Sequence, residues 1–271
     1  MGKSGSLLKT IHLKSIVAAG GNCSSFLSQS GFTVSSWVRS MDALVEAQNL
    51  VVSYGKHVAL RLDDFRIGAG AGVVGLFGPN GAGKSTLLRT IVGDIARVQG
   101  RIVAPHRVAV SYLPDEPFLY PWLRVSQCVD LFRSRYDDFR TGAFEEFLEG
   151  ASFSSSARVS ELSKGMSERL HLALIMSRAP KLYVLDEPLA GVDPLTRDHL
   201  LALIKKYRIP SAPLLLSTHL INGVDSIFDE IVLISDGKLL THDTASHLRD
   251  FGDGDLELAY KRSVSGHVKN D

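Results

Sequence analysis

Short apolar runs alternate with polar, helix-forming stretches along most of this chain. From Val45 onward the pattern predicts a helix from Lys84 to about Val92, directly after one of the apolar runs, and a hairpin turn at Asp236-Gly237. Short runs of this kind are typical of buried parallel strands, so the alternation indicates an α/β fold. The predicted strands are 45–53, 58–66, 73–77, 108–113, 181–185, 213–217 and 230–235.

Residues 116–178 follow a different, helical pattern. Val125, Cys128, Val129 and Phe132 recur at helical spacing and Tyr136 continues the series. A second amphipathic stretch, AFEEFLEG, follows them. We therefore expect a helical subdomain inserted between the strands.

The two ends of the chain lack such patterns. Residues 1–40 are rich in serine and glycine and contain no acidic residue. Their start, MGKSGS, fits a myristoylation signal, and their composition also fits an organelle transit peptide. The interpretation favoured here is a disordered leader or upstream extension ahead of a start at Met41, with the folded domain over residues 41–251. Residues 252–271 are polar and weakly patterned, which predicts a frayed or loosely docked tail.

Composition restricts the possible classes of function. With 271 residues, 45% of them hydrophobic, the chain can bury a sizeable core without disulfides. Cys23 and Cys128 have neither metal-ligand spacing nor a disulfide framework, which fits a reducing cytosol. A formal net charge of +1, without a Lys/Arg cluster, gives no footprint for a nucleic-acid partner. No stretch approaches the roughly 18 apolar residues of a membrane-spanning helix.

Two motifs predict a site for nucleotide and Mg²⁺. In GPNGAGKST the glycines let backbone N–H groups surround phosphates, Lys84 reaches the terminal phosphates, and the Ser85 hydroxyl can bind Mg²⁺. In KLYVLDEP, Asp186 ends a buried strand, where it would hold Mg²⁺ through water, with Glu187 next to it. The expected nucleotide-binding residues of the loop are Gly78, Pro79, Asn80, Gly81, Ala82, Gly83, Lys84, Ser85 and Thr86.

The motif LSKGM lies between these two, and LLLSTH follows them, ending at His219. This order resembles the ATP-binding subunits of ABC transporters over about Val45–Phe251. The resemblance implies a P-loop NTPase domain of the ABC type, with a mostly parallel core sheet, an antiparallel β subdomain and a helical signature subdomain, which uses ATP and Mg²⁺. The segments YLPDEP, LSKGM and LDEPLAGVDP look most like the ABC-2-type exporter branch. The signature residues, implied to act on a nucleotide held by a second subunit, are Leu162, Ser163, Lys164, Gly165 and Met166.

The resemblance also implies individual roles. Glu187 would be the general base, and His219 would contact the γ-phosphate and brace Glu187. Tyr54 matches an aromatic residue that stacks on adenine, although a packed aromatic at a strand end is the structural alternative. Asp193 matches the D-loop. Asp115 stands where the family usually has the Q-loop glutamine, and we expect it to be a further ligand of Mg²⁺.

The signature has a structural interpretation as well. Ser163 in LSKGM can cap an amphipathic helix, because Leu170, Ala173 and Leu174 follow at helical spacing. A helix N-terminus is itself an anion site, so both interpretations can hold.

The family resemblance implies two partners. One is a second ABC subunit, identical or different, arranged head-to-tail; the other is an integral membrane permease that would hold this chain at the cytoplasmic face of the cell membrane. A soluble ABC ATPase with a regulatory role is the alternative. Only 79 positions separate Lys84 from Ser163, too few for the coiled coils of chromosome-maintenance relatives, and no NKxD motif of a GTPase occurs. The sequence does not identify the cargo.

Overall fold

The computed structural model describes residues 43–149, 154–220 and 227–268. Strand β1 begins at Ala43, and residues 44–271 form one compact unit. The expectations for residues 1–40, including Cys23, lie outside the described residues.

All the strands that the structure describes belong to one nine-stranded sheet with the order β4-β1-β2-β9-β8-β3-β7-β6-β5. Strands β8, β3, β7, β6 and β5 run parallel to one another, whereas β1 pairs with β4, and β8 with β9, in antiparallel fashion. The predicted antiparallel subdomain therefore continues the core sheet. The strands are β1 (Ala43–Tyr54), β2 (His57–Gly68), β3 (Val73–Phe77), β4 (Gln99–Val103), β5 (Val110–Leu113), β6 (Leu182–Asp186), β7 (Leu214–Thr218), β8 (Glu230–Ser235) and β9 (Lys238–Thr244).

Alternation along the parallel strands separates two hydrophobic cores. On β3, Val73 and Phe77 belong to one core, while Val74 and Leu76 belong to the other. This is the period of two expected when a strand is buried on both faces. Helices α7, α8 and α9 supply the first core, and α4 with β1 and β2 supplies the second. The helices are α4 (Lys84–Ile91), α5 (Val125–Arg135), α6 (Thr141–Phe147), α7 (Lys164–Met176), α8 (Pro194–Tyr207), α9 (Ala245–Phe251) and α10 (Leu256–Val268).

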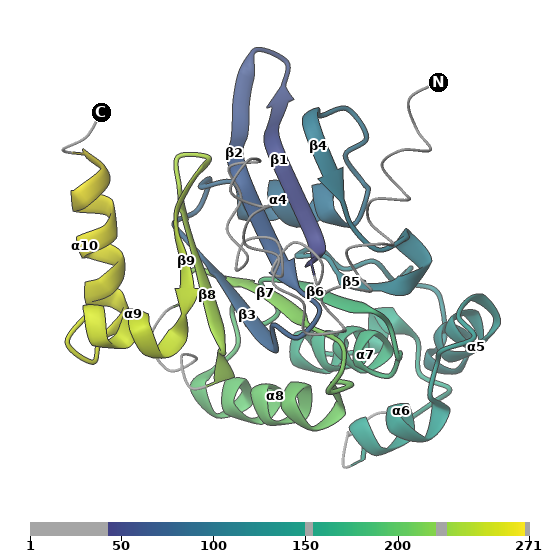
Figure 1. The fold of residues 1–271 in the computed structure, drawn as a ribbon. Helices are drawn as coiled ribbons and strands as arrows, with labels where there is room; N and C mark the ends of the chain where they lie inside the picture. The colour runs from purple at the N-terminus through teal and green to yellow at the C-terminus, as the bar shows by residue number, and fades with distance from the viewer. Residues whose placement is uncertain (1–42, 150–153, 221–226, 269–271) are drawn as a thin grey trace, which may run out of the picture. The chain divides into compact units, whose positions relative to one another are not determined.

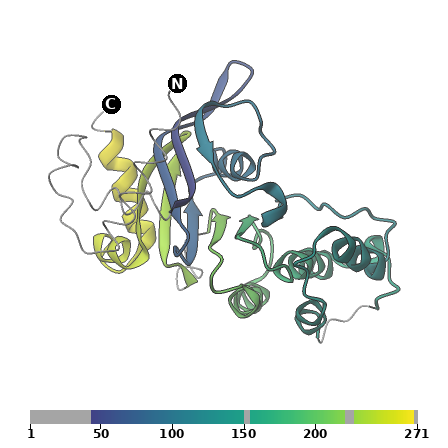
Figure 2. The ribbon, with the colours of Figure 1, turned by 45° about the vertical axis from the view of Figure 1, so that its right-hand side comes forward.

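The helical insert forms as expected. In both views the teal helices α5 and α6 lie beyond the β5 edge of the sheet (Figure 1, Figure 2). Val125 and Cys128 are buried on α5, and Phe144 and Phe147 are buried on α6. Arg178, 2% exposed, links the insert to the sheet, because its guanidinium pairs with Asp138 at 2.9 Å and donates to backbone carbonyls just before and within β5.

The C-terminal segment was predicted to be a frayed or loosely docked tail, but most of it is a helix. Residues Leu256–Val268 form α10, which contacts α9 and β9. Leu256 and Ala259 are buried against the rest of the domain. The apolar face of this helix is weak because it contains few large apolar residues. The helix therefore depends on packing against the domain and not on its own hydrophobic pattern.

The turn between β8 and β9 touches the phosphate loop. Asp236 and Gly237 both have positive φ, 49° and 73°, as a tight two-residue hairpin requires. Gly237 donates to the carbonyl of Ala82 at 3.0 Å and accepts from the N–H of Arg61 at 2.7 Å. A Cβ on Gly237 would meet the carbonyl oxygen of Ala59 at 2.8 Å. This hairpin therefore ties the loop to β2.

Candidate functional site

The loop between β3 and α4 has the geometry of a phosphate cradle. Gly83 caps α4 with φ +104°, a conformation that residues with a Cβ rarely adopt. The helix then begins at Lys84, so its free N–H groups point toward the loop. Leu87 and Leu88 of this helix are fully buried, and their packing fixes the helix on the sheet.

Lys84, Glu187 and His219 form one connected group. The Lys84 ammonium is buried and donates to the carbonyl of Gly78 at 2.8 Å and to that of Pro79 at 3.3 Å. Its nitrogen also lies 3.2 Å from Oε1 of Glu187. The second carboxylate oxygen, Oε2, lies 2.9 Å from Nδ1 of His219. The ends of β6 and β7 and the start of α4 thus bring together three residues that are far apart in the sequence.

Asp186 lies at the end of β6 and is 1% exposed. Burial raises the pKa of its carboxyl, while the hydrogen bond from the Ser217 hydroxyl and the nearby Ser85 hydroxyl act in the opposite direction. Ser217 donates to Oδ1 at 2.5 Å. Oδ2 is buried and accepts no hydrogen bond from any residue that the structure describes. A buried, unpartnered carboxylate oxygen beside a serine hydroxyl fits a bound cation.

The backbone of Glu187 is in the left-handed region, with φ 47°. This conformation costs an L residue with a side chain about 1 kcal/mol. The N–H of Glu187 donates to the Ser217 hydroxyl at 2.9 Å. Ser217 therefore holds both carboxylates of the site, Asp186 through its side chain and Glu187 through its backbone.

A cavity of about 440 Å³ opens beside these carboxylates. Asp115 and Glu116 from the loop after β5 line it, together with Asp186 and Glu187. The negative charge of Asp115 contributes to raising the pKa of Asp186. Asp115 is therefore close enough to affect the charge of the site electrostatically, and it is exposed.

His171 of α7 forms another wall of this cavity. Burial lowers the pKa of its ring. Its Nδ1 lies 2.6 Å from the Ser167 carbonyl, and its Nε2 lies 3.4 Å from the N–H of Leu119. These partners fit the neutral tautomer that carries its proton on Nδ1.

Three further residues predicted for the site, Ser163, Asp193 and Tyr54, lie on the surface. Ser163 caps α7, as the pattern predicted, and its hydroxyl accepts from the N–H of Met166 at 3.3 Å. Asp193 caps α8 in the same way, and hydrogen bonds from Thr196 lower its pKa. Tyr54 ends β1 and is 48% exposed. Among the described residues, no hydrogen bond or ion pair joins Tyr54, Ser163 or Asp193 to the Lys84–Glu187–His219 group.

Ser217 and His171 were not predicted from the sequence as residues of the site. Ser217 lies two positions before His219 in LLLSTH, and a hydroxyl at the end of a buried strand is a signal that could have identified it. His171 gave no such signal, because only the packing of α7 against the loop after β5 brings it to the cavity.

Comparison with known proteins agrees with this geometry. Residues 62–190 match the family model described as ABC transporter. The aliphatic sulfonates import ATP-binding protein SsuB 2 of Frankia alni is 36% identical over 198 residues, which cover 72% of this chain and 78% of that protein. This chain belongs to the ABC transporter ATP-binding family.

Other relatives of this ABC subunit carry both importer and exporter-like names. The lantibiotic transport ATP-binding protein SrtF of Streptococcus pyogenes is 29% identical over 73% of this chain and 89% of its own length. A solved structure described as an ATP-binding subunit of an ABC transporter superposes with a TM-score of 0.71 at 25% identity, covering 82% of this chain and 99% of the other. The fold predicted from the motifs is confirmed. None of the described helices is long and apolar enough to cross a membrane.

Proposed function

We propose that this ABC subunit hydrolyses ATP with Mg²⁺ at the Lys84–Glu187–His219 group and so drives a separate membrane permease, as an exporter. The proposal rests on one observation: the buried ammonium of Lys84 and the carboxylate of Glu187, which His219 holds, lie together beside the phosphate-binding loop. One relative is named for import and another for lantibiotic transport, and the segments YLPDEP and LSKGM favour export.

Ser85 and Asp186 are the residues that would hold Mg²⁺, with Asp115 as a further ligand. The unpartnered Oδ2 of Asp186 is the feature that such an ion would satisfy. A bound Mg²⁺ neutralises negative charge on the phosphate oxygens during transfer.

Residues of this chain would bind the nucleotide and activate the water. Lys84 holds the terminal phosphate oxygens by charge-assisted hydrogen bonds. Glu187 accepts a proton from the attacking water through one carboxylate oxygen while His219 holds the other at 2.9 Å. The exposed Tyr54 ring is available to stack on adenine.

A second chain would complete the site. Ser163 and Gly165 are exposed at the N-terminus of α7, where the free N–H groups favour an anion. A Cβ on Gly165 would meet no atom within 4 Å, so the surface around it is open. Each chain would thus supply its Ser163 turn to the nucleotide on the phosphate loop of the other, head-to-tail.

The permease would bind near the loop that follows β5. Tyr120 and Trp122 stack with ring centroids 4.7 Å apart and are 60% and 65% exposed. Exposed aromatic pairs of this kind are frequent anchors of protein interfaces. The chain would then lie at the cytoplasmic face of the membrane.

The experiment is affinity purification of the tagged chain from solubilised membranes of its source cells, with mass spectrometry of what accompanies it. We expect an integral membrane protein, lost in the variant Trp122→Ser, and Mg²⁺-dependent ATP hydrolysis that is lost in Lys84→Met. The matched surface variant Leu131→Ser should keep both. Hydrolysis without any membrane companion would instead support a soluble regulatory ATPase.

A further inference from the structure

A buried histidine of α7 holds the loop that follows β5. His171 is 5% exposed, and its ring packs edge-to-face with that of Phe118, with centroids 4.7 Å apart and planes at 90°. Its Nε2 accepts a hydrogen bond from the N–H of the next residue, Leu119, at 3.4 Å. Among the residues that the structure describes, no other hydrogen bond joins residues 114–119 to the rest of the chain. His171 is therefore the polar anchor of this part of the loop.

The second half of the same loop has its own anchor. Backbone N–H groups of residues 159–160, just before the signature, donate to the carbonyls of Leu123 and Pro121, both at 2.9 Å. The exposed, stacked rings of Tyr120 and Trp122 belong to the segment between the two anchors. Release of the first anchor would therefore free one end of the segment that presents this aromatic pair.

The protonation state of His171 decides whether the first anchor exists. Nδ1 donates to the carbonyl of Ser167 at 2.6 Å, which leaves the lone pair of Nε2 for the N–H of Leu119. Protonation would put a second N–H on the ring, opposite the N–H of Leu119, and repulsion would replace the hydrogen bond. Burial lowers the pKa of His171 from 6.5, so the ring is neutral at pH 7.5. The anchor is thus present at neutral pH and lost in acid.

Several charged groups face the cavity that His171 lines. In the described part of the chain, none of them forms an ion pair or a hydrogen bond with His171. Burial raises the pKa of Glu168 and of Asp186, so acid also acts on carboxyl groups of this cavity. The groups are Asp115 and Glu116 on the loop, Lys164 and Glu168 on α7, and Asp186 and Glu187 at the end of β6.

We infer that His171 is a positioning residue for the partner surface: by holding Leu119 it fixes the segment that presents Tyr120 and Trp122. The inference rests on the proposed contact of this aromatic pair with a membrane permease. Preorganised anchors bind more tightly than mobile ones, because less conformational freedom is lost on binding. The permease would therefore bind this chain more weakly in acid, although His171 does not touch it.

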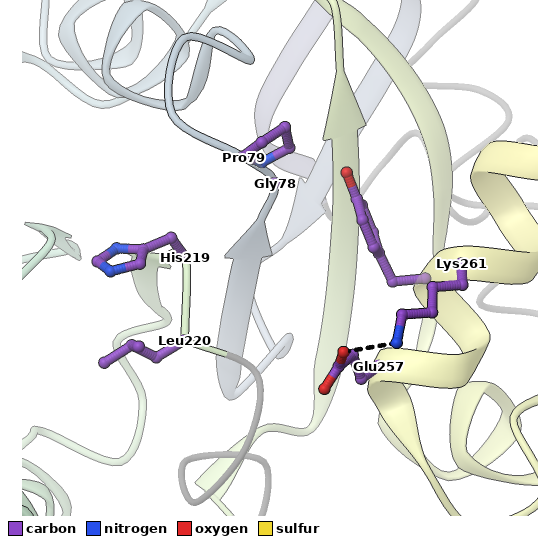
Figure 3. A pocket seen from close by; sticks show the side chains of 7 residues that line it. Gly78, Pro79, His219, Leu220, Glu257 and Lys261 are labelled. Carbon is purple, nitrogen blue, oxygen red and sulfur yellow. Dashed lines mark ion pairs between the residues drawn. The ribbon is translucent and has the colours of Figure 1, made fainter.

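A second histidine beside a cavity provides a control for general effects of acid. His219 lines a pocket of about 440 Å³ on the other side of the phosphate loop, and the far wall of this pocket is α10. Figure 3 shows Glu257 and Lys261 of α10 joined by an ion pair, across the pocket from Pro79 and from the turn that carries His219. No hydrogen bond links His219 to residues 114–119 within the described ranges. Its titration should leave the aromatic pair in place.

Fluorescence anisotropy tests the anchor without any partner or nucleotide. The chain has two tryptophans, so Trp37→Phe leaves Trp122 as the single reporter. We expect the anisotropy of Trp122 to fall between pH 7.5 and pH 5.0, because its segment is released. His171→Gln takes up no proton but keeps an acceptor for the N–H of Leu119, so the fall should disappear. His171→Ala has no acceptor and should show the low anisotropy at both pH values.

Matched variants show which group causes the fall. His219→Gln and Glu168→Gln should keep it, because neither side chain holds Leu119. Circular dichroism at both pH values checks that each variant remains folded. A fall of equal size in His171→Gln, or no fall in the parent, would overturn the inference and leave the proposed permease contact standing.

Affinity purification from solubilised membranes at the two pH values tests the effect on the partner. We expect the parent to recover severalfold less membrane protein at pH 5.0 than at pH 7.5, and His171→Gln to recover equal amounts. Equal recovery by the parent would show that the anchor does not control the partner surface, which also overturns the inference. If no membrane protein is recovered at either pH while the anisotropy falls as expected, the permease contact is wrong and the anchoring role of His171 stands.

Discussion

The ammonium nitrogen of Lys84 lies 3.2 Å from Oε1 of Glu187, and both side chains are largely shielded from solvent. The pair joins the residue that would hold the phosphates to the residue that would activate water. Salt screens such a shielded pair weakly. Phosphate oxygens bound by Lys84 would compete with Glu187 for the same ammonium group. Binding of nucleotide and readiness of the base are therefore coupled through Lys84.

This competition predicts an unusual pair of effects for Glu187→Gln. Removing the carboxylate charge should tighten ATP binding severalfold, because Lys84 loses its rival and the phosphates lose a nearby negative charge. Hydrolysis should fall by about 10² to 10⁴, the usual contribution of a general base. Equilibrium titration with a fluorescent ATP analogue and a phosphate-release assay measure the two. Weaker binding, or turnover equal to that of the parent, would contradict the assignment.

The left-handed backbone at Glu187 predicts a difference between two inactive variants. Both Glu187→Gly and Glu187→Ala remove the carboxylate, but only alanine keeps the Cβ that disfavours φ 47°. We expect the glycine variant to be the more stable by about 1 kcal/mol. Urea unfolding of the two proteins side by side measures this, and equal midpoints would show that the backbone is not strained at this position.

Asp115 lines the carboxylate cavity where the family usually has a neutral glutamine. Its charge should strengthen the dependence on Mg²⁺, because the carboxylate favours a cation nearby and repels bare phosphates. For Asp115→Asn we expect a higher Mg²⁺ midpoint of hydrolysis, with metal-free nucleotide binding unchanged or tighter. Glu116→Gln is the matched control one position away. Identical midpoints for Asp115→Asn and the parent would leave Asp115 as an ordinary loop residue.

His171 predicts a loss of stability in mildly acidic solution. Burial lowers its pKa from 6.5, so below about pH 6.5 the unfolded chain binds a proton that the folded chain does not. The free energy of unfolding should therefore fall as the pH drops from 7.5 to 5.5. Urea unfolding at both values should show a smaller fall in His171→Gln than in the parent. The exposed His199→Gln is the control, and an equal fall in all three proteins would rule out His171 as the cause.

Much of this architecture could be predicted from the sequence. The apolar run at 73–77 and the strand at 230–235 have the observed bounds, because strands buried on both faces leave an unambiguous pattern. Strand β4 was not predicted, since its exposed residues QGRIV show no alternation. The predicted run at 108–113 splits into a single helical turn and the shorter β5. Where packing, and not the local pattern, decides the element, as in α10, the sequence carried too little signal.

The candidate site, like the fold, could be predicted from the sequence only in part. The family resemblance that the motifs carry grouped Lys84, Glu187 and His219, whose contacts the structure now gives. The contribution of Ser217 and the approach of α10 depend on which strand ends and helices become neighbours in space. Spacing along the chain does not encode that, so these contacts required the structure.

In the proposed pair, one chain's phosphate loop and another chain's signature form a single hydrolytic site. The most direct measurement is the ATP turnover of a mixture of two inactive variants, Lys84→Ala and Ser163→Ala. In mixed pairs both defects fall on one site, which leaves the other site with an intact Lys84 and an intact Ser163. We expect the mixture to hydrolyse ATP although neither variant does so alone. A mixture as inactive as its components, under conditions where the chains are shown to exchange, would contradict it.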